Sequence, residues 1–171
     1  MELNLSPHFN KPEVFNTVKT FLEYHNFKIV NSDENRPWGG FYVIDESQAA
    51  QFINFFFKDV PQAKNSLGEK LSPKILIVEG EKRLSWQYHH RRAEIWKVID
   101  GEVGVITSTT DEEGEIQLKK RDDIIILKQG ERHRLVGTNS WGIIAEIWQH
   151  TDSDNPSNEN DIVRLQDDYG R

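Results

Sequence analysis

The chain has 171 residues, a formal net charge of −7 and no cysteine. This length suits one domain with a sizeable hydrophobic core. The negative charge argues against a general nucleic-acid binder, which would carry a basic surface. The lack of cysteine excludes disulfides and thiolate metal sites, so any metal must be bound by His, carboxylate or amide groups.

The N-terminal stretch MELNLSPHFNKPE has neither the basic region nor the apolar region of a signal peptide. No apolar run approaches the roughly 20 residues that a membrane-spanning helix needs. We therefore expect a cytoplasmic protein with no membrane and no nucleic-acid partner.

Two segments in the first third of the chain have the apolar spacing of helices. In residues 11–26 the apolar side chains recur every three or four positions after a proline in the first turn; they are Val14, Phe15, Val18, Phe21 and Leu22. The second segment, residues 46–59, would be capped by Ser47 and ended by Pro61. We expect both helices to pack on the core, with an intersubunit contact as the alternative for Phe55–Phe57.

From residue 73 onward, short β-rich runs alternate with turns. Turn signals lie at Asp100–Gly101, Glu113–Gly114, Gln129–Gly130 and Gly137–Asn139. The expected strands lie within residues 39–45, 74–80, 96–108, 114–120, 122–130, 133–138 and 141–149. This regular spacing predicts a mainly β chain folded as an antiparallel sandwich or small barrel.

The stretch LSWQYHHRRAEIW, residues 84–96, concentrates candidate metal ligands. Alternate side chains of a strand share a face, so Ser85, Gln87 and His89 point the same way. Because the parity changes before Glu94, the residues HRRA must form a turn or bulge, after which Glu94 can return to that face. His133, on another expected strand, offers a fourth ligand.

Two imidazoles, a carboxylate and an amide oxygen suit Zn, Fe, Mn, Co or Ni, with room left for a water or sugar oxygen. The alternative is that His89 and His90 only mark a hairpin end while Glu94 pairs with Arg91 or Arg92. Spacing alone leaves both interpretations open.

The pattern resembles the two cupin motifs. Gly80, Gln87, His89, Glu94 and Gly101 follow the first motif, with Gln in place of its first His. Residues 128–133, KQGERH, follow the second motif, with Lys in place of its Pro.

A closer resemblance is to the cupin domain of type II phosphomannose isomerases. It is carried by RPWG at 36–39, GEKRLSWQYHHRRAEIW at 80–96, HRL at 133–135 and NDIVRLQDDYGR at 160–171. The resemblance implies a single cupin domain over residues 1–171, a double-stranded β-helix or jelly-roll barrel. Residues 1–35 would be an N-terminal helical extension, 36–150 the barrel with the helical insert at about 46–59, and 151–171 a C-terminal loop and tail.

The resemblance also implies one divalent metal held by Gln87, His89, Glu94 and His133. Zinc is the first choice, since the Gln-x-His pair is similar to the zinc-binding arrangement of type I phosphomannose isomerases. The implied reaction interconverts mannose 6-phosphate and fructose 6-phosphate through an enediol, so the implied partner is a small sugar phosphate. The family often occurs fused behind a sugar-nucleotide transferase domain, which this chain is too short to contain.

Such a reaction needs a base and an electrophile for the developing oxyanion. Glu146 lies among apolar residues in mid-strand, where a carboxylate facing the interior is costly without a task and burial raises its pKa. The alternative is that Glu146 faces outward and pairs with a surface cation. His90 is the second candidate base, although its parity points it away from the ligands.

The phosphate requires fixed cations, for which Arg is well suited. The candidates are Arg36, Lys82, Ser85, Arg134 and Arg171, and Arg134 is also counted with the catalytic residues because it follows the His133 ligand.

Other functions stay open at this point. The chain is alternatively a non-catalytic sugar-binding or regulatory cupin, a cupin enzyme for another sugar phosphate, or a dioxygenase, against which Gln87 argues mildly. A homodimer is also open, because cupins commonly pair through sheet edges.

Overall fold

The computed structural model describes residues 1–170. The helical segments are α1 (Lys11–Tyr24), a 3-10 turn η1 (Glu46–Gln48), α2 (Ala49–Phe56) and α3 (Pro61–Lys64). The first strands are β1 (Ile29–Arg36), β2 (Gly39–Ile44), β3 (Lys74–Val78), β4 (Trp86–Tyr88), β5 (Arg92–Asp100) and β6 (Glu102–Ser108). The remaining strands are β7 (Ile116–Lys120), β8 (Ile124–Leu127), β9 (Arg132–Gly137), β10 (Gly142–His150) and β11 (Val163–Gln166).

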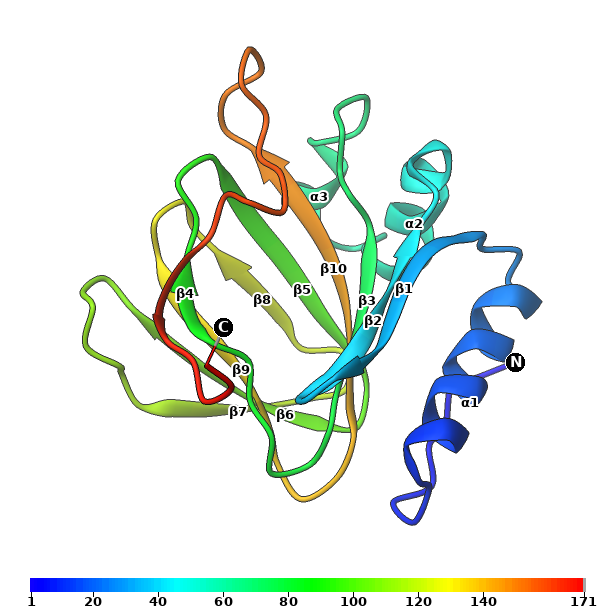
Figure 1. Ribbon diagram of the computed structural model, residues 1–171. Helices are drawn as coiled ribbons and strands as arrows, with labels where there is room; N and C mark the ends of the chain where they lie inside the picture. The colour runs from blue at the N-terminus through cyan, green and yellow to red at the C-terminus, as the bar shows by residue number, and fades with distance from the viewer. Residues whose placement is uncertain (171) are drawn as a thin grey trace.

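The strands form two antiparallel sheets that face each other (Figure 1). One sheet has the order β1-β2-β3-β10-β5-β8 and the other the order β11-β4-β9-β6-β7. This double-sheet arrangement is the jelly-roll architecture of cupins. It confirms the predicted mainly β cupin class with an N-terminal helix and a helical insert.

The helices cover the outer face of the six-stranded sheet, where α1 lies beside β1 and β2 (Figure 1). A capping box begins α1, since the Asn10 side chain accepts from the backbone N–H of Glu13 and the Glu13 carboxylate accepts from the backbone N–H of Asn10. The predicted second helix is present as η1 followed by α2. Its cap is Asp45 rather than Ser47, and Pro61 begins α3 instead of only ending the segment before it.

Alternation along the central strands divides the core into two clusters. On β10, Ile143, Ala145 and Ile147 join the helices in the outer cluster, whereas Ile144 faces the space between the sheets. A central strand buried on both faces is apolar almost throughout, which explains the run IIAEIW. Glu146 interrupts that run on the inner face.

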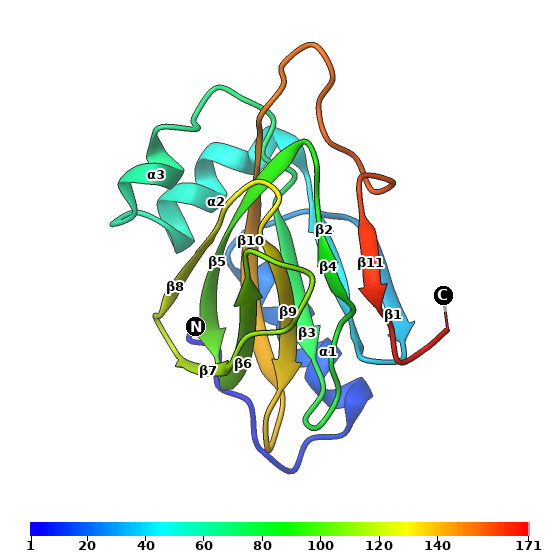
Figure 2. The same ribbon diagram turned by 90° about the vertical axis from the view of Figure 1, so that its left-hand side faces the viewer.

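Two strands lie outside the predicted set. β1 pairs with β2 inside the expected helical extension, and β11 pairs with β4 inside the expected C-terminal loop. Figure 2 shows the C-terminal segment returning beside β4. The chain between β10 and β11 therefore crosses one end of the barrel and brings its residues to the space between the sheets.

Within residues 1–170, no helix combines the length and apolarity needed to span a membrane. Phe55 is 41% exposed while Phe56 and Phe57 are buried in the outer cluster, so an intersubunit role for this triplet stays a prediction.

Candidate metal centre

A cavity of about 130 Å³ lies between the inner faces of the two sheets. Its charged and imidazole side chains come from six strands, from the turn between β4 and β5, and from the loop before β11. They are Arg36, Lys74, His89, Arg92, Glu94, His133, Glu146, Glu159 and Arg164. Four aromatic side chains also line the cavity: Trp38, Phe41, Trp96 and Trp148.

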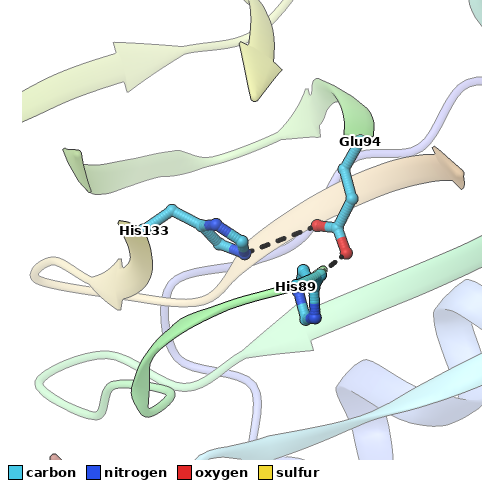
Figure 3. A group of neighbouring side chains, drawn as sticks. All are labelled: His89, Glu94 and His133. Atoms are coloured by element: carbon cyan, nitrogen blue, oxygen red, sulfur yellow. Dashed lines mark ion pairs between the residues drawn. The ribbon is translucent and has the colours of Figure 1, made fainter. Parts of the chain in front are cut away.

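The side chains of His89, Glu94 and His133 point toward one another (Figure 3). All three line this cavity and are buried. Glu94 Oε1 lies 3.2 Å from His89 Nε2, and Glu94 Oε2 lies 3.6 Å from His133 Nε2. The candidate ligand atoms of the three residues all lie within 4.8 Å of one another. This group could hold a metal ion.

Backbone carbonyls orient both imidazoles. His89 Nδ1 is 2.7 Å from the carbonyl oxygen of Asp161, and His133 Nδ1 is 3.1 Å from that of Glu131. A carbonyl oxygen can only accept, so each Nδ1 carries a proton, and each Nε2 is the ring nitrogen that faces Glu94. Such a hydrogen bond on the far nitrogen is the usual support for a metal-binding histidine.

The protonation states also suit a cation. Burial lowers the pKa of His133 to about 4, so its imidazole is neutral near neutral pH. Burial alone would raise the pKa of Glu94, but His89, His133 and Arg92 together hold it well below its ordinary value. The neutral His133 imidazole and the ionised Glu94 carboxylate, together with the His89 imidazole, form a donor set that fits a divalent ion such as zinc.

Gln87 lines the same cavity and is buried, as the alternation in β4 predicts. In the β4–β9 pair its backbone lies directly opposite that of His133. Its amide is therefore on the same inner face as the three ligand candidates, while its role as a fourth ligand stays a prediction.

Arg92 contacts the same group from one side. Its Nε donates to Glu94 Oε1 at 2.8 Å, and its Nη2 lies 3.2 Å from His89 Nε2. Both sequence interpretations of Glu94 thus have a counterpart here, because Glu94 meets the imidazoles and also pairs with Arg92. A metal bound to His89 Nε2 would have to replace the Arg92 contact at that nitrogen.

Glu146 faces the interior, close to this group. Trp96 Nε1 donates to its Oε2 at 2.8 Å and Trp148 Nε1 donates to its Oε1 at 3.1 Å. Burial and the negative charge of Glu94 raise the pKa of Glu146 to about 8. The alternative that Glu146 faces outward toward a surface cation is wrong, whereas His90 is exposed and does not line the cavity.

The residues proposed for phosphate binding separate into two groups. Arg36 and Ser85 line the cavity. Lys82 is exposed at the turn before β4 and does not line it. Arg171 lies outside the described residues.

Arg134 is not brought to the cavity, which corrects the expectation that it works beside His133. It is fully buried, and its Nη1 donates to Glu113 Oε1 at 2.5 Å while its Nη2 donates to the carbonyl oxygen of Gln166 at 3.1 Å. Neighbours on a strand point to opposite faces, so a residue adjacent to the inward His133 must face outward.

Four charged cavity residues were absent from the sequence prediction of the site: Lys74, Arg92, Glu159 and Arg164. Arg92 had an available signal, since it stands two residues before Glu94 and shares its strand face. The sequence also contained a signal for Lys74, because it is the first residue of an otherwise apolar strand. Glu159 had none, because it lies in an irregular polar loop.

Comparison with known proteins identifies the family of this chain. Residues 62–167 match the family described as mannose-6-phosphate isomerase C-terminal. The xanthan biosynthesis protein XanB of Xanthomonas campestris pv. campestris (strain B100) is 29% identical over 136 residues, which cover 80% of this chain and 23% of XanB. The mannose-1-phosphate guanylyltransferase of Escherichia coli (strain K12) is 28% identical over 142 residues, which cover 83% of this chain and 24% of that protein. The alignment thus spans about a quarter of these relatives.

Among solved structures, the capsular polysaccharide assembling protein CapF from Staphylococcus aureus has a TM-score of 0.52 at 12% identity. The match covers 82% of this chain and 34% of CapF, and it shows a shared fold. The family match extends over more than half of the residues and includes His89, Glu94, His133 and Glu146. The chain therefore belongs to the mannose-6-phosphate isomerase C-terminal family.

Proposed function

We propose that this chain is a metal-dependent aldose–ketose isomerase that interconverts mannose 6-phosphate and fructose 6-phosphate. One observation carries the proposal: the buried group His89, Glu94 and His133 shares a cavity with Glu146, a carboxyl whose pKa is raised to about 8. A candidate electrophile site and a candidate base thus face the same enclosed space. Membership of the family supports the choice of substrate.

His89, Glu94, His133 and Gln87 would hold one divalent ion, with zinc as the first choice. When bound, that ion would supply an electrophile that polarises the carbonyl oxygen of the open-chain sugar. The backbone carbonyls of Asp161 and Glu131 keep both Nε2 atoms turned inward, so the ligand set is preorganised.

Glu146 would move the proton between the two carbon atoms. Its carboxylate takes the proton from C2 of mannose 6-phosphate, and the C2–H electron pair becomes the C1=C2 double bond of the enediol as O1 gains a proton. The same carboxyl then returns its proton to C1 as O2 gives up its hydroxyl proton and becomes the carbonyl oxygen. A raised pKa makes this carboxylate a stronger base than a solvated one. The indole N–H groups of Trp96 and Trp148 fix both of its oxygens.

A specific contact favours a second candidate, a non-catalytic sugar-binding cupin. Arg92 already donates to Glu94 and lies against His89 Nε2, so the imidazole–carboxylate group has a partner without any metal. In that case the cavity would bind a sugar phosphate, but the chain would not convert it.

A coupled assay for fructose 6-phosphate formed from mannose 6-phosphate tests the proposal. With zinc present, the chain should turn over, and Glu146→Gln should lower kcat by about 100-fold or more. Glu102→Gln, an exposed carboxylate on β6, is the matched control and should keep wild-type turnover. Unchanged turnover in Glu146→Gln would exclude Glu146 as the base. Binding of the sugar phosphate without any turnover would favour the second candidate.

A further inference from the structure

Lys74 is a buried cation whose side chain faces the cavity. It begins β3, and its backbone lies opposite Glu146 in the β3–β10 pair, so the two side chains share the inner face. Only 9% of the Lys74 side chain is exposed. An ammonium group loses much of its hydration at such a position and therefore requires partners.

Aromatic rings form part of those surroundings. Lys74 Nζ lies 4.3 Å from the centroid of the Trp148 ring and 5.7 Å from that of Phe41. The guanidinium of Arg92 lies 3.7 Å from the centroid of the same Trp148 ring. Two cations gathered around one indole make this wall of the cavity attractive to an anion.

Glu159 is the carboxylate that pairs with Lys74. Its side chain is 73% exposed, and it belongs to the irregular segment between β10 and β11. The pair therefore joins a buried ammonium to a carboxylate in solvent, at the opening of the cavity. Because an exposed carboxylate stays hydrated, giving up such a pair costs little.

We propose that Lys74 Nζ binds the phosphate of the sugar phosphate, and that Glu159 occupies this position until substrate displaces it. The proposal rests on the proposed function for the identity of the substrate. A phosphate brings more charge and more acceptor oxygens than the carboxylate it replaces, so the three ammonium donors of Lys74 are better satisfied after the exchange. The phosphate stays at the cavity opening, and the sugar extends inward toward Glu146 and the histidines.

Binding measurements on the full chain test this assignment without relying on turnover. Isothermal titration with mannose 6-phosphate, inorganic phosphate and unphosphorylated mannose would compare the wild type with Lys74→Met and Glu159→Gln. We expect Lys74→Met to weaken both phosphate probes at least about 10-fold. Glu159→Gln should tighten both several-fold, and mannose binding should not change in either variant.

The chain offers a matched control. Lys97 on β5 pairs with Asp122, and the side chains of this pair are 23% and 77% exposed, against 9% and 73% for Lys74 and Glu159. Neither Lys97 nor Asp122 lines the cavity. Lys97→Met and Asp122→Asn should bind all three probes like the wild type. Thermal unfolding verifies that each variant is folded, and Lys74→Arg should recover part of the phosphate binding.

Two results would overturn the assignment: wild-type phosphate binding in a folded Lys74→Met variant, or weaker phosphate binding in Glu159→Gln. A kcat loss in Lys74→Met with unchanged binding would also contradict it, because Lys74 would then act on the chemical step. Phosphate binding that depends on Lys74 in a chain without isomerase activity would refute the proposed function and leave this site standing.

Discussion

At the residue scale, each of the two histidines uses one ring nitrogen for orientation and leaves the other for a ligand. His89 and His133 hold backbone carbonyls through Nδ1, and their Nε2 atoms flank the carboxylate of Glu94. Desolvation keeps His133 neutral, which a metal ligand requires. The surroundings therefore orient the two imidazoles toward Glu94 and keep His133 in the neutral form that binds a cation.

Replacing one histidine tests whether this group of side chains binds zinc. We expect His133→Ala to weaken zinc binding about 100-fold or more, because one of the ligands is lost outright. The measurement is a competition titration with a zinc chelator, followed by metal analysis of the purified chain. His8→Ala, at an exposed position before α1, is the control and should bind zinc like the wild type. Equal zinc affinity in His133→Ala would show that His133 is no ligand.

Asp161 supports the site through hydrogen bonds to its carboxylate and its backbone carbonyl. Its carboxylate accepts from the backbone N–H groups of His90 and Arg91 and from Ser157 Oγ, while its carbonyl holds His89. Burial alone would raise the pKa of Asp161, but these hydrogen bonds lower it to about 2 from 3.8. The folded state therefore favours the ionised form.

The lowered pKa predicts how stability depends on pH. The contribution of Asp161 is fully present above about pH 4 and is lost as the pH falls from there toward about 2. Its size at neutral pH is roughly 2 kcal/mol. The free energy of unfolding of Asp161→Asn should thus lie about that far below the wild type at pH 7, with a gap that shrinks toward pH 2. A gap of constant size over this range would contradict the assignment.

Strand alternation explains which site residues the sequence could reveal. Gln87 and His89 were predicted to face inward from parity, and both line the cavity, as does Glu94 after the turn. The same rule, applied to Arg134 next to His133, would have placed it outside the cavity. Glu159 could not be found in this way, because its position depends on how a polar loop crosses the barrel end.

At the element scale, the central strands connect two separate cores. The outer face of the six-stranded sheet packs on the helices, while its inner face carries the cavity and the second apolar cluster. A defect in the outer core should therefore lower stability without changing the metal site.

Phe52 in α2 provides that test, since its side chain is fully buried in the outer core. We expect Phe52→Ala to lower the free energy of unfolding by roughly 3–5 kcal/mol while zinc affinity stays unchanged. The neighbouring Phe55, 41% exposed, is the control, and Phe55→Ala should cost less than about half as much. Urea unfolding and a zinc titration give the two readouts. A parallel loss of zinc affinity in folded Phe52→Ala would show that the two cores are coupled.

Periodicity determined which elements the sequence could reveal. α1 and α2 have clear helical spacing, and the central strands are rich in β-branched residues, so most of these elements were predicted close to their observed bounds. The exception is β5, which begins at Arg92, inside the HRRA stretch that was expected to be a turn or bulge. β1 reads IVNSDENR and is mostly exposed at the edge of its sheet. β11 is short and lies at the edge of the other sheet. Edge strands bury little apolar surface, so neither carries the alternation that predicts a strand.

At the scale of the whole molecule, the two sheets enclose a polar cavity that is closed from one side by the returning C-terminal segment. That segment supplies the Asp161 carbonyl to His89, the Glu159 carboxylate to Lys74, and β11 to the edge of the five-stranded sheet. Residues 85 positions apart, Lys74 and Glu159, thus meet in one site. The proposed isomerase function depends on this closure, because a desolvated cavity raises the pKa of Glu146 and strengthens charge interactions.

The most direct test of the account is the rate of fructose 6-phosphate formation from mannose 6-phosphate before chelation, after complete metal removal, and after zinc is restored. We predict turnover in the first sample, loss of at least about 100-fold in the second, and recovery in the third. Circular dichroism of the second sample should show that the fold is retained. Full turnover by the folded, metal-free chain would contradict the account.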